Sequence, residues 1–329
     1  MIRLLFFLYL SVLLTQLGCE TDRSDNVGQS ADTAEESSPD ADTTSGDSQS
    51  DVGQGGNNNG GSPNTAWSEP LTDFADLSDL KTGYDPSQWY PTFLELLNRR
   101  YPTGRFIVES LSNSEQEAKQ WLQAVGNIDT FAGLVQGANT TVHEMNHGLS
   151  FQEGIATNFD TYAYVLREDL TYIVPRITTF NRKEILPYLT GPLGKGSNGY
   201  YFYIEDTIAS HDFFSVLDEF NAYIHSSFTG YGLHDEAAPG LKTSDRNGTL
   251  TFMLYTQYYL LHARENHPNV YTAILADPDI KELVGSLWKR AVFILDVTKD
   301  IPALEINAGP LETLMLSEEL QQEIAPFLD

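Results

Sequence analysis

The sequence predicts a predominantly helical α+β domain over residues 67–329. Apolar residues recur every three or four positions through most of this stretch, as expected of helices that bury one face. β-branched and aromatic residues gather instead between positions 159 and 180, which favours a small antiparallel sheet there. No internal repeat and no second low-complexity segment divides the stretch, so a single domain is the simplest arrangement.

Residues 1–19 have the features of an export signal. Arg3 gives a positive start, and residues 4–14 form an apolar stretch too short to span a membrane in a mature protein. Cys19, the only cysteine, ends the sequence QLGC, which resembles a bacterial lipobox. The resemblance implies a lipoprotein signal peptide over 1–19, lipid attachment at Cys19, and a place in the cell envelope on the outer membrane or cell surface rather than the inner membrane. An ordinary secretory signal is the alternative, and both readings export the chain.

Residues 20–66 are predicted to form a disordered acidic tether. The segment has no aromatic residue, Leu, Ile or Met, so it cannot bury enough apolar surface to offset the entropy of ordering. Ten acidic residues stand there against Arg23 alone, and their mutual repulsion should extend the chain. A flexible segment of this length spans roughly 35 to 40 Å, enough to hold a folded domain away from lipid headgroups.

The remaining part is strongly acidic. Of the 46 acidic and 19 basic residues, ten acids and Arg23 fall in the tether and Arg3 in the leader, which leaves 36 acids against 17 bases. This charge excludes nucleic acid and anionic membrane surfaces as favourable partners of the domain. A cationic substrate or a divalent metal would be attracted instead, although the charge can also serve solubility alone.

The first predicted helices precede position 155. Residues 86–101 place Trp89, Tyr90, Phe93, Leu94 and Leu97 on one side, and the sequence SEQE at 114–117 is typical of a capping box ahead of a second helix. Asp129 is a suitable N-cap for a longer helix that ends near Gly154. Gly133 and Gly137 weaken that helix but allow close packing.

The segment between positions 159 and 204 is predicted to hold strands. Pro175 limits any strand around it to a sheet edge or a bulge. The glycine-rich stretch 191–199 lacks the glycine order of a phosphate-binding loop and is expected to be a mobile turn before a strand at 200–204. Helical patterns return over 212–228, 250–264, 280–295 and 311–327.

One motif in the long helix carries chemistry. His143, Glu144 and His147 form the pattern H-E-x-x-H, and one helical turn puts both imidazoles on the same face, where they can share a metal ion. Glu144 then lies beside the open coordination position and can take a proton from water. The competing interpretation is two histidines and a glutamate on a solvated helix face.

At these residues the sequence resembles the zincin-like zinc metallopeptidases. The clan whose third ligand is histidine requires a glycine and a histidine at the positions of Ser150 and Glu153. Without the glycine the helix continues, and Glu153, rotated by about 240° from His147, points away from the metal. Glu153 is therefore only an alternative ligand.

The gluzincin clan takes a glutamate from a later helix instead. That resemblance implies Glu219 as the third ligand, because it borders the apolar stripe of the helix predicted over 212–228 and a carboxylate there needs a partner. Asp218 is the alternative. For the oxyanion donor that zincins need near the third ligand, Tyr223 is preferred because it lies one turn after Glu219. His225, Tyr231 and His234 are the other candidates.

The sequence thus predicts Zn²⁺-dependent hydrolysis of a peptide or related amide by an exported, lipid-anchored protein. The predicted metal ligands are His143, His147 and Glu219, and the predicted catalytic residues are Glu144 and Tyr223. The expected partners are a peptide or protein substrate and, through the anchor, a membrane. A non-catalytic surface lipoprotein that acts as a binding module is the first alternative, and a zinc enzyme acting on another substrate is the second.

Overall fold

Helices dominate the part of the chain that the structure describes. The computed structural model describes residues 67–69, 71, 74–157, 160–197, 200–205 and 211–328, so the predicted signal peptide, Cys19 and the predicted tether at 20–66 lie outside the described residues. In that part, many helices accompany one two-stranded antiparallel sheet, which confirms the predicted helical α+β class. A search of the same residues found no helix both long and apolar enough to cross a bilayer.

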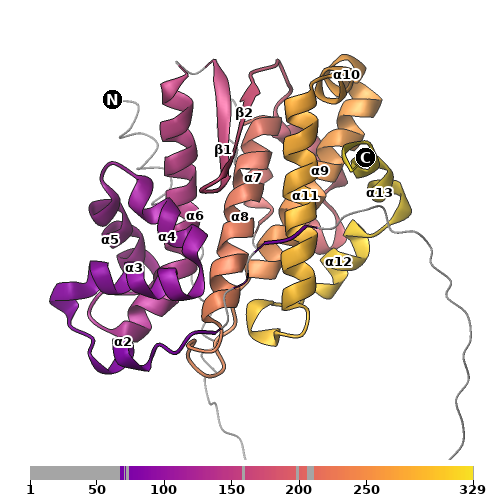
Figure 1. Cartoon of the computed structure of the whole chain (residues 1–329). Coiled ribbons are helices and arrows are strands. Elements are labelled where there is room, and N and C mark those ends of the chain that lie inside the picture. The colour runs from indigo at the N-terminus through magenta and orange to yellow at the C-terminus, as the bar shows by residue number, and fades with distance from the viewer. Residues whose placement is uncertain are drawn as a thin grey trace, which may run out of the picture. The chain divides into compact units, whose positions relative to one another are not determined.

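Four long helices carry most of the core and run side by side (Figure 1). They are α6 (Phe131–Ala156), α8 (Phe213–Leu233), α9 (Asp245–Asn266) and α11 (Pro278–Thr298). α8 packs against each of the other three. Its side chains are buried on nearly every face, as expected of a helix surrounded by apolar neighbours. Among them are the residues of the predicted apolar stripe, Phe213, Val216, Leu217, Phe220 and Ile224.

The N-terminal helices pack against α6 and against one another. They are α2 (Ser78–Thr82), the short η1 (Pro86–Gln88), α3 (Trp89–Arg100), α4 (Pro102–Ser110) and α5 (Ser114–Val125). The predicted close packing at Gly137 is confirmed, since a Cβ there would lie 3.0 Å from Leu122 Cδ2 and 3.2 Å from Leu122 Cα. The glycine lets the backbones of α5 and α6 approach.

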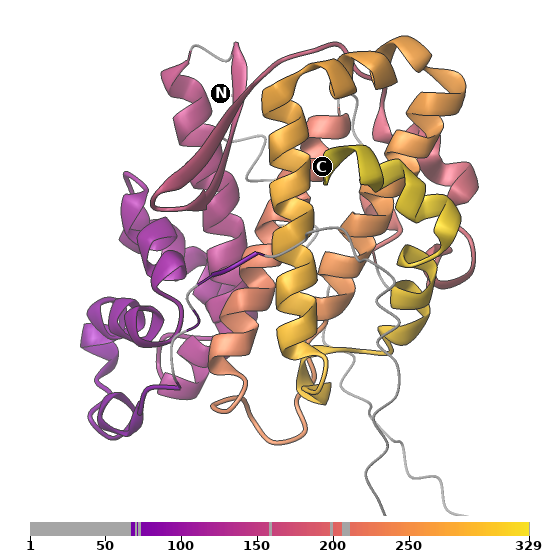
Figure 2. The same ribbon diagram turned by 45° about the vertical axis from the view of Figure 1, so that its right-hand side comes forward.

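Each C-terminal helical segment packs against one or more of the long helices α8, α9 and α11 (Figure 2). They are α10 (Pro268–Ala276), η4 (Pro302–Leu304), α12 (Gly309–Met315), α13 (Glu318–Ile324) and η5 (Ala325–Phe327). The helix predicted over 311–327 is therefore three shorter pieces, because Ser317 is extended and interrupts it.

The sheet is a hairpin of β1 (Thr161–Arg167) and β2 (Leu170–Pro175), which confirms the predicted sheet between 159 and 180. Thr161 pairs with Pro175 and Val165 with Thr171, and the register shifts between Val165 and Arg167. β1 packs on α6 and α8, and β2 packs on α11.

Short helical segments connect β2 to α8: η2 (Arg182–Tyr188), η3 (Gly191–Leu193) and α7 (Phe202–Glu205). The predicted strand at 200–204 is wrong. The N–H groups of Tyr203 and Ile204 bond to the carbonyl oxygens of Tyr200 and Tyr201, each at 3.0 Å. Both side chains are buried, and a helical turn against η2 buries them without the neighbouring strand that an extended segment needs.

Two predicted helix caps are also wrong. Thr130 rather than Asp129 caps α6, because its Oγ1 atom accepts a hydrogen bond from Gly133 N–H at 3.0 Å. The Asn127 side chain accepts hydrogen bonds from the N–H groups of Asp129 and Thr130 just before the helix. No capping box forms at α5, whose N-cap is Asn113. The Ser114 hydroxyl oxygen instead accepts a hydrogen bond from the Tyr90 hydroxyl, at 2.9 Å.

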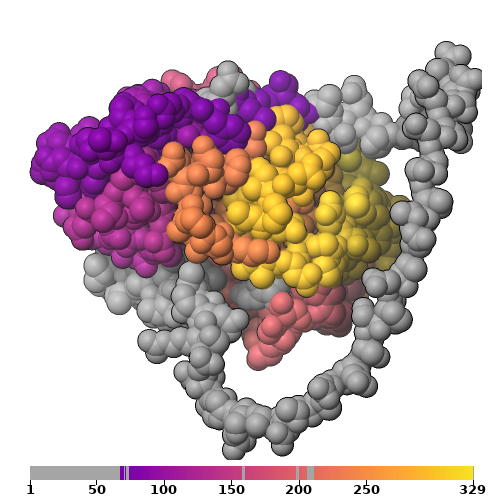
Figure 3. Space-filling model, turned by 90° about the horizontal axis from the view of Figure 1, so that it is seen from below, coloured from indigo at the N-terminus to yellow at the C-terminus, as the bar shows by residue number. Residues whose placement is uncertain are grey.

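The segment after α8, residues 234–244, lies between the N-terminal helices and a C-terminal part of the chain (Figure 3). Asp235 pairs with Arg100 of α3 at 2.8 Å, and Glu236 pairs with Lys81 of α2 at 3.2 Å. At its other end, Thr243 N–H donates to Ala303 O at 2.7 Å. This segment therefore links the N-terminal helices to the stretch that follows α11.

Candidate metal centre

The two histidines of the motif lie on one face of α6. Their rings are 4.9 Å apart between centroids and nearly perpendicular, and the Nε2 atoms lie 3.2 Å from each other. His143 is 6% exposed and the His147 side chain 12% exposed. The interpretation of two histidines on a solvated helix face is therefore wrong, because α8 and its neighbours cover this face of α6.

Glu219 of α8 completes a three-ligand cluster with the two imidazoles. Its Oε2 atom lies 3.6 Å from the Nε2 atom of His143 and 3.6 Å from that of His147. Two ligands that each bind zinc at about 2.0 to 2.1 Å with tetrahedral angles stand roughly 3.3 to 3.4 Å apart. The three separations of 3.2, 3.6 and 3.6 Å thus fit one face of a zinc tetrahedron.

The environment of Glu219 supports this fit. Within the described structure its Oε2 atom is buried and has no hydrogen-bond partner. Burial raises the pKa of Glu219, but the nearby imidazoles of His147 and His143 outweigh burial and hold the pKa well below its usual range. A buried, ionised oxygen without a hydrogen bond is costly unless a cation satisfies it.

Asp218 contacts the other nitrogen of His147. Its Oδ2 atom lies 2.8 Å from His147 Nδ1, so this nitrogen donates to the carboxylate and Nε2 is on the side of Glu219. Burial lowers the pKa of His147, but Asp218 and Glu219 outweigh it and raise the pKa well above its usual value. Asp218 thus orients the His147 imidazole, in the way that carboxylates commonly orient metal-binding histidines.

The structure does not bring either alternative ligand into the cluster. Asp218 faces Nδ1 of His147 rather than the space between the three ligand atoms. Glu153 lies two turns further along α6 and does not belong to the group of ligand atoms within 4.8 Å of one another. The continued helix separates it from His147, as expected.

Glu144 lies beside the ligands on α6. In the described structure its Oε2 atom is buried and has no hydrogen-bond partner. Burial raises the pKa of Glu144, and the neighbouring histidines His143 and His147 oppose that rise.

Tyr223 also lies at the cluster. Its ring meets the His143 ring edge-on at 4.5 Å and stacks on Phe252 at 5.1 Å. Its Oη atom lies 2.9 Å from Tyr203 Oη, and burial raises the pKa of Tyr223 well above the usual value, which keeps the phenol neutral. Gly248 makes room for the ring, because a Cβ there would lie 2.2 Å from Tyr223 Cδ1.

The other proposed oxyanion donors lie elsewhere. His225 is fully buried in a separate network, where its Nδ1 atom is 2.7 Å from Tyr101 Oη and its Nε2 atom 3.0 Å from Val165 O. Tyr231 and His234 lie at the end of α8 and pack against Phe74, with ring centroids 5.3 and 5.1 Å away. The structure therefore does not bring these three alternatives into the cluster, because successive turns of α8 face different neighbours.

Three polar residues near the cluster escaped prediction. Tyr203 of α7 bonds to Tyr223, and the carboxylates of Glu219 and Glu144 help to raise its pKa. Arg182, the first residue of η2, is buried, and Glu219 partly offsets the lowering of its pKa by burial. Burial, and then Arg182, lower the pKa of His211 to about 4, so its imidazole is neutral. No motif marks these residues, and position 203 was assigned to a strand.

A buried amide network fixes the two ligand-bearing helices beside each other. Asn221 of α8 donates to Asn146 Oδ1 of α6 at 2.9 Å and to Val165 O of β1 at 3.0 Å. Asn146 donates to the same carbonyl oxygen at 3.0 Å. Asn146 directly precedes His147 and Asn221 follows Glu219 by two positions, so these bonds set the register of the ligands.

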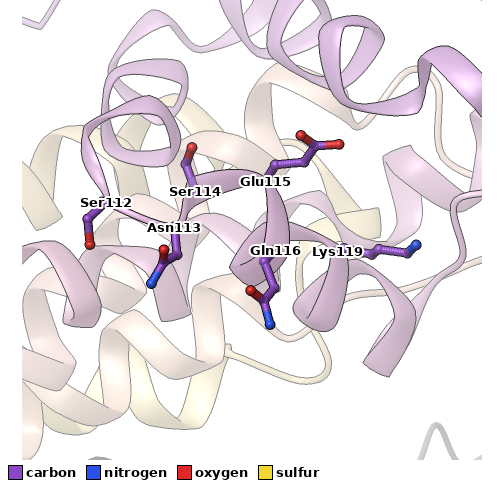
Figure 4. A pocket seen from close by; sticks show the side chains of 6 residues that line it. All are labelled: Ser112, Asn113, Ser114, Glu115, Gln116 and Lys119. Atoms are coloured by element: carbon purple, nitrogen blue, oxygen red, sulfur yellow. The ribbon is translucent and has the colours of Figure 1, made fainter.

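A separate shallow hollow lies at the start of α5 (Figure 4). Its lining residues are Ser112, Asn113, Ser114, Glu115, Gln116 and Lys119. It shares no residue with the cluster of His143, His147 and Glu219 and contains no set of metal-ligand side chains.

Comparison of the chain with protein-family models, with curated proteins and with solved structures finds no significant match. The resemblance to zincin-like peptidases therefore rests on the H-E-x-x-H motif of the sequence and stays a prediction.

Proposed function

We propose that the protein is a zinc-dependent hydrolase of peptide or related amide bonds. Zn²⁺ would be held by His143, His147 and Glu219, and Glu144 would act as the general base. The observation that carries the proposal is the set of ligand-atom separations of 3.2, 3.6 and 3.6 Å, contributed by two helices that are distant in sequence. The same residues enclose a buried carboxylate oxygen that lacks a hydrogen bond in the described structure.

Zinc bound at such a site supplies a Lewis acid and lowers the pKa of coordinated water to about 7. The protein must then move the proton. Glu144 is adjacent to His143, and its free oxygen can accept a proton from attacking water and pass it to the leaving amine. Asp218 holds the His147 ring so that Nε2 is directed at the space between the three candidate ligand atoms, where an ion would be held.

The tyrosine pair suits the developing negative charge on the carbonyl oxygen. Tyr223 lies against His143, and its hydroxyl is hydrogen-bonded to that of Tyr203 at 2.9 Å, so the pair places phenol hydroxyls next to the cluster. Both phenols are held neutral by burial, so they can donate a hydrogen bond at neutral pH. Donors of this kind are what acyl transfer requires beyond a metal and a base.

Replacement of the base tests the proposal. Glu144→Ala should keep one zinc ion at this cluster, because Glu144 is not a ligand, and should lose about 100-fold to 10,000-fold in turnover. Zinc content is measured by elemental analysis of the dialysed full chain. Turnover is measured against fluorogenic peptides, peptidoglycan fragments and other amides, which also decides the substrate class.

Glu153→Gln is the matched control, since it removes a carboxylate from the same helix outside the cluster. It should leave both zinc content and turnover unchanged. Full activity of Glu144→Ala would refute the role of the base. A wild-type chain without stoichiometric zinc at His143, His147 and Glu219 would favour the non-catalytic binding protein instead.

A further inference from the structure

We infer that the chain has a second site for a divalent transition metal, built from Glu184, His262 and His267. Glu184 lies in η2, His262 in the last two turns of α9, and His267 at the junction between α9 and α10. None of the three belongs to the cluster around Glu219. The inference is independent of the proposed hydrolase activity.

The ligand atoms converge on one point. The Oε2 atom of Glu184 lies 3.4 Å from His262 Nε2 and 2.9 Å from His267 Nε2, and all three atoms lie within 4.8 Å of one another. Ligands of a tetrahedral zinc ion stand roughly 3.3 to 3.4 Å apart. The Glu184 side chain is 44% exposed, so its carboxylate can adjust to an ion and an ion can reach it from solvent.

A hydrogen-bond relay directs the lone pair of His262 toward the site. Its Nδ1 atom lies 3.2 Å from Tyr188 Oη, and that hydroxyl donates to Glu265 Oε2 at 3.3 Å. The Tyr188 oxygen can therefore accept a hydrogen bond from Nδ1–H, and in that tautomer Nε2 is unprotonated and able to bind a metal. The side-chain amide nitrogen of Asn266 lies 3.1 Å from the same nitrogen, so Nδ1 has a donor within reach as well as the Tyr188 acceptor; the metal-binding tautomer is the one in which Nδ1 donates to Tyr188.

Aromatic stacking holds His267 in place. Its ring stacks on Phe180 with centroids 4.3 Å apart and planes 17° apart, and Phe180 stacks on Tyr259 at 4.0 Å. The His262 ring meets Phe180 edge-on at 5.2 Å. Both imidazoles are thus fixed on a rigid surface, so binding an ion would cost little side-chain entropy.

The donor set indicates the class of ion. Two imidazoles and one carboxylate suit Zn²⁺, Ni²⁺ or Co²⁺ better than Mg²⁺ or Ca²⁺, which prefer oxygen ligands. An ion there would tie η2 to the α9–α10 junction. Arg182, the buried first residue of η2, lies on the side of Glu219, so this ion would also secure a segment that borders the first cluster.

The test is a zinc count on full-length variants, dialysed against low-micromolar buffered zinc and then analysed for metal. Wild type should hold two zinc ions and the double variant His143→Gln/His147→Gln one. His262→Gln/His267→Gln should also hold one. His234→Gln is the matched control, a histidine in neither cluster, and should hold two.

Spectroscopy separates this inference from the proposed function. Co²⁺ added to His143→Gln/His147→Gln should give a visible absorption band that Glu184→Gln, introduced in addition, removes. Glu184 is a surface side chain, so this variant keeps the fold, which circular dichroism checks. If His262→Gln/His267→Gln binds as much zinc as wild type, the second site does not exist. If His143→Gln/His147→Gln binds as much as wild type, the first cluster fails and the second stands.

Discussion

Adjacent acids on α8 have different roles in this structure, and Asp218→Asn tests that difference. Glu219 Oε2 lies 3.6 Å from both imidazole Nε2 atoms, whereas Asp218 Oδ2 lies 2.8 Å from His147 Nδ1. Asparagine keeps the size of the side chain and an oxygen that can accept from Nδ1, but it removes the charge. The ligand set stays complete, and only the support of one ligand weakens.

The expected magnitude follows from these positions. Loss of a partner that orients a ligand histidine weakens metal binding by about 10-fold to 100-fold, or about 1.4 to 2.7 kcal/mol. Glu219→Gln removes a ligand and leaves a neutral amide in a buried site, so its zinc affinity should fall further than that of Asp218→Asn. At saturating zinc, Asp218→Asn should recover most of its turnover and Glu219→Gln should not.

The assay is competition for zinc between the full chain and a chromophoric chelator at fixed pH. The second site is removed from every variant with His262→Gln/His267→Gln, so that one class of site is titrated. Asp296→Asn is the control, because Asp296 is 73% exposed and forms a surface ion pair with Lys299, away from both clusters. Equal losses in Asp218→Asn and Glu219→Gln, or a larger loss in Asp218→Asn, would contradict the assignment.

Three further changes test the surroundings of the cluster. Gly248→Ala forces a Cβ against the Tyr223 ring and should lower the free energy of unfolding in denaturant by about 1 to 3 kcal/mol, with zinc content retained. An unchanged unfolding midpoint would contradict this packing. Arg290→Met leaves the buried Glu69 carboxylate without its 2.6 Å partner and should lower the free energy of unfolding by about 3 to 5 kcal/mol, or roughly 6 to 10 °C in Tm. Adding Glu69→Gln should restore part of this loss. Burial and the nearby Arg290 hold the pKa of His225 well below its unfolded value of 6.5. Below pH 6.5 the unfolded chain therefore takes up a proton at this residue that the folded chain does not, so the fold loses stability as the pH falls. In EDTA, wild type should therefore lose Tm more steeply between about pH 7 and pH 5 than His225→Gln, and parallel pH profiles would exclude this role.

The sequence was sufficient for the parts of the fold that depend on periodicity. The spacing of His143 and His147 fixes their common face once residues 131–156 are helical, and that helix follows from its apolar repeat. Glu219 could be chosen because it borders a stripe that α8 buries. The structure places the three predicted side chains together, and their role as zinc ligands stays a prediction.

The remaining features depend on contacts between segments that no local pattern reports. Asp218 and Glu219 differ by one position, and only the placement of α8 beside α6 decides which carboxylate meets which nitrogen of His147. Tyr203 reaches the cluster because a short apolar segment folds as a helical turn where a strand was equally compatible with its composition. Glu184 lies 78 residues before His262 in the second cluster, so no motif joins them.

The buried amide network explains how the first cluster can exist before an ion binds. The Val165 carbonyl oxygen accepts from Asn146 of α6 and Asn221 of α8 at 3.0 Å, and His225 Nε2 of α8 also lies 3.0 Å from it. Sliding α8 by one turn would leave these buried polar groups without hydrogen-bond partners and would destabilise the fold by about 1 to 3 kcal/mol for each lost partner. The register that satisfies them is the one that brings Glu219 level with both imidazoles. The fold therefore positions the ligands by hydrogen bonds that involve no metal, and the chain should fold without zinc, unlike small domains whose structure depends on the ion.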